Sequence, residues 1–170
     1  MRKILYIIFF FSTTFNTAAQ VEKRDSLLGL LQAAKDDTGK VMLLLNIADT
    51  YEASNQDSSI YYLERSKQLS VGLKFKRGIY HYYEQSAIVS FTKGDYNLSM
   101  LQSNSALAIA RELKDSGLVI NMLNNTGIVY QYLGQFDRQL EYTLQALEIT
   151  EKTNRKEKLV AMYHNVANAY

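Results

Sequence analysis

The 170-residue sequence contains no cysteine, no proline and no tryptophan. Without cysteine the chain has no disulfide, no thiolate metal ligand and no thiol nucleophile. At average usage, about eight prolines are expected in a chain of this length. Because helix interiors exclude proline, its absence predicts a nearly all-helical chain whose helices are joined by short turns. The length suits one domain or one array of repeats.

The first nineteen residues have the order of a secretory signal peptide. Arg2 and Lys3 supply positive charge, residues 4–11 form an unbroken apolar run, and small residues end at Ala19. The run is too short for a stable membrane span, which needs about 20 apolar residues. We therefore expect a signal peptide over residues 1–19, cleavage before Gln20 and export from the cytoplasm. An uncleaved membrane tether and a buried first helix are the alternatives.

The charge of the remaining chain is balanced. The whole sequence has 19 Lys and Arg against 17 Asp and Glu, so removal of Arg2 and Lys3 leaves 17 residues of each sign. An evenly mixed, neutral chain has no long-range field that would collect polyanions. Nucleic acid is therefore not an expected partner of this segment.

A repeat of about 40 residues runs through the rest of the chain. The small residues Ala48, Ala87, Gly127 and Ala167 stand 39, 40 and 40 positions apart, and three of them are followed three residues later by tyrosine. All four lie in segments with helical periodicity, and each of the first three segments is followed by a turn and a second periodic segment. A small residue lets two helix backbones approach closely. The pattern predicts helical hairpins that stack into a solenoid.

The repeat resembles the tetratricopeptide repeat. The resemblance rests on the small residue and tyrosine of the first helix, on the turns at residues 94–96 and 134–136 (Gly-x-aromatic), and on the Ala-Leu pairs at 106–107 and 146–147. It implies an all-α right-handed superhelix of helical hairpins. The family's usual repeat has 34 residues and ends in proline. The longer period here, without proline, suggests longer helices or longer links.

The repeat divides the chain into segments. We expect a lead-in helix over residues 20–40, a degenerate first repeat over 41–79, further repeats over 80–119 and 120–159, and the start of a fourth over 160–170. The first repeat is degenerate because Asn55 takes the place of the turn glycine. Arrays of this kind normally end in a capping helix with a polar outer face. Residues 160–170 would leave an apolar face uncovered, so we expect the front part of a longer protein.

No residue group indicates catalysis. The two histidines, His81 and His164, stand alone and belong to no His-Glu-x-x-His pair. Residues 38–40 (Thr-Gly-Lys) lack the upstream glycine of a phosphate-binding loop and are predicted to form a turn. Acidic residues are scattered over helix surfaces. We expect no catalytic residue, no metal and no cofactor, and therefore no enzyme within these residues.

One polar pattern follows the repeat, two residues before each small residue. In tetratricopeptide proteins the first helices line a concave groove, so the resemblance implies that this column faces a bound chain. Carboxamides both donate and accept hydrogen bonds, which suits a peptide backbone. The alternative is that the amides cap or join adjacent helices. The candidate groove contacts are this column and the residues one helical turn from it: Asn46, Asp49, His81, Gln85, Asn121, Asn125, Asn165 and Asn168.

These observations predict an exported, non-catalytic interaction module that binds a peptide or protein segment in its groove. The signal peptide, the lead-in and the 40-residue repeats also resemble the periplasmic front part of Bacteroidetes-type sensor histidine kinases of two-component systems. That resemblance implies signal transduction at the periplasmic face of the inner membrane. Membrane contact would come only from the signal peptide or a downstream helix. A regulator with a DNA-binding output domain and a free periplasmic binding protein are the alternatives.

Overall fold

The computed structural model describes residues 20–167, and every regular element in that range is an α-helix. The expected signal peptide, residues 1–19, lies outside the described residues. The described residues form two compact units that divide between Leu69 and Ser70, and the boundary falls near the end of one helix. The all-α prediction is confirmed for the described residues.

The first unit contains a helix over residues 20–33, then α2 (Thr38–Tyr51) and most of α3 (Gln56–Gly72). The first helix is thus shorter than the lead-in helix expected over 20–40. A turn is predicted at residues 38–40, but these residues form the first turn of α2. The reason is Asp37, whose side chain accepts a hydrogen bond from the Lys40 backbone N–H and so caps α2.

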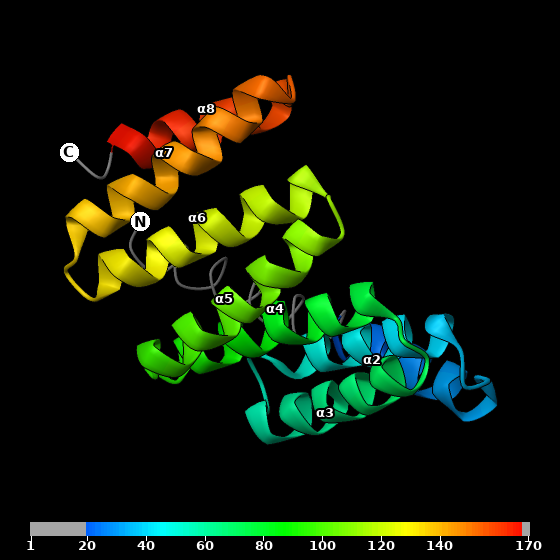
Figure 1. Ribbon diagram of the computed structural model, residues 1–170. Coiled ribbons are helices and arrows are strands. Elements are labelled where there is room, and N and C mark those ends of the chain that lie inside the picture. The colour runs from blue at the N-terminus through cyan, green and yellow to red at the C-terminus, as the bar shows by residue number, and fades with distance from the viewer. Residues whose placement is uncertain (1–19, 168–170) are drawn as a thin grey trace, which may run out of the picture. The chain divides into compact units, whose positions relative to one another are not determined.

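The second unit is a run of antiparallel helices that pack in chain order (Figure 1). Helix α5 packs against both α4 and α6, and α7 packs against both α6 and α8. Successive helix pairs therefore repeat one hairpin arrangement, as the 40-residue period predicts. The five helices are α4 (Lys76–Thr92), α5 (Tyr96–Glu112), α6 (Ser116–Tyr132), α7 (Phe136–Lys152) and α8 (Lys156–Ala167).

The turns after α3 to α7 share one backbone geometry, which explains the period. In the turn after α4, Gly94 has φ +79°, its N–H donates to the Phe91 carbonyl, and the Asp95 N–H donates to the Ser90 carbonyl. This is a Schellman cap, which ends a helix on a left-handed residue. The same left-handed position recurs every twenty residues, at Lys74, Gly94, Lys114, Gly134 and Asn154.

Helices of 17 residues alternate with three-residue turns from α3 to α7. Two such units make the 40-residue repeat, so the long period comes from long helices and not from long links. Each helix measures about 25 Å at 1.5 Å per residue.

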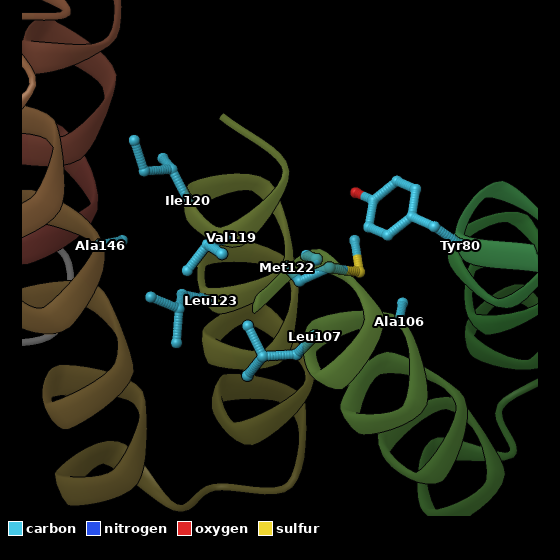
Figure 2. Close-up of a cluster of buried hydrophobic side chains, with 9 residues drawn as sticks. Tyr80, Ala106, Leu107, Val119, Ile120, Met122, Leu123 and Ala146 are labelled. Atoms are coloured by element: carbon cyan, nitrogen blue, oxygen red, sulfur yellow. The ribbon is translucent and has the colours of Figure 1, made fainter. Parts of the chain in front are cut away.

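A cluster of buried hydrophobic side chains lies within the second unit and spans α4 to α7 (Figure 2). The first helices of the hairpins supply most of its large side chains, such as Tyr80 of α4 and Met122 of α6, and Figure 2 shows Met122 pointing toward Tyr80. The second helices supply Ala106 and Ala146, which are fully buried. Large side chains facing these alanines let the helices pack closely at the cluster.

The small residues of the repeat lie where helices come closest. A Cβ atom built on Gly127 would lie 3.2 Å from Thr143 Oγ1 and 3.5 Å from the Gln139 carbonyl oxygen, both on α7. At the equivalent place in α4, the Ala87 carbonyl accepts a hydrogen bond of 2.8 Å from Ser99 Oγ of α5. The expectation that these residues permit close backbone approach is confirmed at both positions.

Candidate binding pocket between α4 and α6

A cavity of about 190 Å³ lies within the second unit. Three helices form it: α4 and α6 carry mostly apolar residues, and α5, which packs against both, carries two serines. Its lining residues are Ala87, Ile88, Phe91, Ser99, Ser103, Asn125, Ile128 and Val129.

The pocket has an apolar wall and a polar floor. Ile128 is 37% exposed and therefore lies near the mouth, whereas Ser103 is only 1% exposed and lies deep. The Ser99 hydroxyl is used in the bond to α4, but the buried Ser103 Oγ has no hydrogen-bond partner among the described residues. A buried hydroxyl without a partner is costly and uncommon in folded proteins.

Asn125 is the predicted groove residue that lines this pocket. Asn125 is partly exposed. Gln85 occupies the equivalent place in α4, but its Oε1 is buried and has no hydrogen-bond partner within residues 20–167. The same position of the repeat therefore has different surroundings in successive helices.

Two other candidates bind neighbouring side chains. His81 Nδ1 lies 2.9 Å from Glu84 Oε2, and the other oxygen of Glu84 accepts a 2.7 Å hydrogen bond from the Tyr80 hydroxyl. Burial, together with the nearby Glu84 carboxylate, raises the pKa of Tyr80. Asn121 Oδ1 accepts a hydrogen bond from Lys158 Nζ and so joins α6 to α8. The Asn121 contact matches the alternative in which amides join adjacent helices, whereas the contacts of His81 and Tyr80 with Glu84 lie within α4.

The remaining candidates lie in the first unit or outside the described part. Asn46 and Asp49 are exposed on α2, and Asp49 lies 3.9 Å from Lys23 Nζ of the first helix. The side chain of Asn165 and the whole of Asn168 lie outside the described residues. Ligand contact by any of the eight candidates stays a prediction.

An aromatic cluster adjoins the pocket through Phe91. The Phe91 ring lies 5.5 Å from the Tyr96 ring and 4.8 Å from the Tyr132 ring, and the two tyrosine rings are 5.8 Å apart. Tyr132 is 60% exposed, so the cluster continues the apolar surface toward solvent. The Gly-x-aromatic turn identified Tyr96 in the sequence, but nothing there indicated that Tyr132 would join it.

Ion pairs join α4 to its neighbours. Arg77 Nη2 lies 2.8 Å from Asp115 Oδ2, and Lys76 Nζ lies 2.8 Å from Glu112 Oε2. Asp115 also caps α6 by accepting hydrogen bonds from the Gly117 and Leu118 N–H groups. The hydrogen bond from Arg77 and those two backbone bonds hold the pKa of Asp115 below its usual value. No ionised group lines the pocket itself.

The described residues contain no cluster of three or more His, Asp or Glu side chains placed to hold a metal ion. Within residues 20–167, no helix combines the length and apolar character needed to cross a membrane.

Comparison of the sequence with protein families and with curated proteins finds no match. Solved structures do match. A Signal Transduction ATPase with Numerous Domains from Pyrococcus horikoshii, which has a tetratricopeptide repeat sensor, is 17% identical with a TM-score of 0.77, and the match covers 91% of this chain and 25% of that one. A Rap protein complexed with Competence and Sporulation Factor is also 17% identical, with a TM-score of 0.70 and coverages of 93% and 51%.

A chain of kinesin light chain TPR-like repeats from Podosopora anserina is 18% identical, with a TM-score of 0.70 and coverages of 91% and 79%. The chain has the tetratricopeptide-repeat fold. This confirms the fold that the resemblance implied. The chain spans about a quarter of the Pyrococcus protein and about half of the Rap protein. At these identities the likeness concerns the tetratricopeptide-repeat architecture alone.

Proposed function

We propose that this chain is a non-catalytic interaction module that binds an extended peptide or protein segment across α4 and α6. The observation that carries the proposal is the pocket between these helices, where the partly exposed Asn125 lies beside an apolar wall. Asn125 donates to and accepts from the peptide backbone, and the pocket takes a side chain. The Rap protein of the same fold, whose structure contains Competence and Sporulation Factor, supports a binding role.

Replacement of Asn125 by alanine tests this function. Peptides are first selected from a random display library for binding to the wild-type chain. We expect them to bind the Asn125→Ala variant about tenfold more weakly than the wild type. The expected loss corresponds to one or two hydrogen bonds at about 1 kcal/mol each. Titration calorimetry with the selected peptides measures the dissociation constants.

The matched control is Asn104→Ala, which makes the same change at an exposed position of α5. This variant is expected to bind as the wild type does. Equal affinity of all three proteins, with unchanged helical circular dichroism, would show that the peptides bind elsewhere and would refute the proposed site.

Export is a further part of the proposal. The order of charge, apolar run and small residues over 1–19 supports a cleaved signal peptide and a periplasmic location. N-terminal sequencing of the protein recovered from a periplasmic fraction is expected to begin at Gln20. Recovery in the cytoplasm with residues 1–19 intact would contradict export.

A sensory role in signal transduction is the narrower proposal. The Pyrococcus protein, a signal transduction ATPase, carries its tetratricopeptide repeats as a sensor, which supports this role. If the chain is the front part of a sensor kinase, as this proposal holds, a membrane helix and a kinase domain follow residue 170. We expect the full reading frame to encode an apolar stretch of about 20 residues and then a histidine kinase. A reading frame that encodes only a further capping helix would favour a free periplasmic binding protein.

A further inference from the structure

We propose that the pocket between α4 and α6 is specific for a phenol group, and that it receives a tyrosine side chain of the bound segment. This inference rests on the proposed function, because it names the side chain that the binding face selects. Three observations support it: the volume of the cavity, the apolar character of its wall and the unpartnered hydroxyl at its floor.

The volume suits one aromatic ring. A protein cavity of about 150 Å³ lined by Leu, Ile and Phe binds benzene. The cavity here measures about 190 Å³ and is lined by similar groups, including Ile88, Phe91 and Val129. The additional volume accommodates the hydroxyl of a phenol.

The floor distinguishes a phenol from a purely apolar ring. Buried hydroxyls at the equivalent face of other second helices donate to a carbonyl of their own helix, as Thr143 does to Gln139 in α7 and Ser66 does to Leu63 in α3. Ser103 makes no such bond: the residue lines the pocket, and its Oγ is buried without a partner among the described residues. A side chain that reaches it needs an apolar body and a polar tip, which tyrosine has.

The mouth of the pocket fits a residue within a peptide. Asn125 lines the pocket and is partly exposed, so it can bind the backbone of the residue whose ring enters. No ionised side chain lines the cavity, and a charged group entering it would lose its hydration without a partner. The pocket therefore disfavours acidic and basic side chains.

The test uses p-cresol, which is the tyrosine side chain, and toluene, which is the same ring without the hydroxyl. Amide chemical shifts of the ¹⁵N-labelled chain measure both dissociation constants. In Ser103→Ala the affinity for p-cresol is expected to fall about fivefold, while the affinity for toluene stays the same or rises. The difference reflects one hydrogen bond between neutral groups.

A second variant tests the cavity itself. The first repeat carries Leu63, a buried residue, where the second carries Ser103, so Ser103→Leu introduces a side chain that this position accepts elsewhere in the chain. It is expected to abolish binding of both probes while the helical circular dichroism is retained. Equal loss of p-cresol and toluene in Ser103→Ala, or no p-cresol binding by the wild type, would refute the phenol pocket. Weaker peptide binding by Asn125→Ala would still support the interaction module in either case.

Discussion

Replacement of Tyr80 by alanine is expected to lower the free energy of unfolding by about 3–5 kcal/mol, the usual cost of deleting a buried ring. Tyr80 is 0% exposed and belongs to the cluster that joins α4, α5, α6 and α7. The substitution leaves a cavity beside Met122 and also leaves Glu84 without its 2.7 Å hydrogen bond from the Tyr80 hydroxyl. Urea unfolding followed by circular dichroism at 222 nm measures the change.

Two further variants separate the causes. Tyr80→Phe keeps the ring and removes only the hydrogen bond to Glu84, so the expected cost is about 1–2 kcal/mol. Tyr61→Ala makes the larger change at a tyrosine that is 57% exposed, and it is expected to cost about 1 kcal/mol or less. A loss for Tyr80→Ala no larger than that for Tyr61→Ala would show that the cluster does not hold the helices together.

Much of this architecture follows from local rules that the sequence displays. The absence of proline, the 40-residue period and the Gly-x-aromatic turns at 94–96 and 134–136 predict helical hairpins without any knowledge of tertiary contacts. The recurrence of the turns every twenty residues was not predicted. The turns that link one repeat to the next carry lysine or asparagine at the left-handed position. Lys114 adopts φ +53°, a conformation that favours glycine, so the residue at this position does not by itself indicate a left-handed helix cap.

The candidate site was harder to predict than the fold. A spacing of 40 residues places Gln85 and Asn125 on equivalent helix faces, but it does not say which neighbouring side chains surround each amide. Asn125 lines a pocket, while the Gln85 Oε1 is buried. The Asn121 side chain accepts a hydrogen bond from Lys158, which lies 37 positions away in the chain.

The polar floor of the pocket was not foreseen for a related reason. Second helices of the repeat bury small and polar residues on their inner face, including Ser103, Thr143 and Thr150. A serine at such a position is compatible with a bond to its own helix, so the sequence gives no reason to expect a free hydroxyl. The signal lies in the side-chain conformation, which depends on how closely α4, α5 and α6 pack.

Replacement of Gly127 by leucine is expected to destabilise the chain by about 3 kcal/mol, because it forces α6 away from α7. The new Cβ would lie 3.2 Å from Thr143 Oγ1 and 3.5 Å from the Gln139 carbonyl oxygen. The hydroxyl can rotate away, but the carbonyl belongs to the backbone of α7, so the helices themselves must separate. Urea unfolding at 25 °C measures the loss.

The matched control for this prediction is Gly29→Leu. Gly29 lies within the helix over residues 20–33, and a Cβ there meets no atom within 4 Å. This variant is expected to gain up to about 1 kcal/mol, since glycine is a poor helix former. Gly127→Ala is expected to be nearly neutral, because the gain in helix propensity offsets the close contact and Ala87 already occupies the equivalent place in α4. If Gly127→Leu were as stable as Gly29→Leu, close approach at the small residue would not be what fixes the spacing of α6 and α7, and the repeat would need another physical basis.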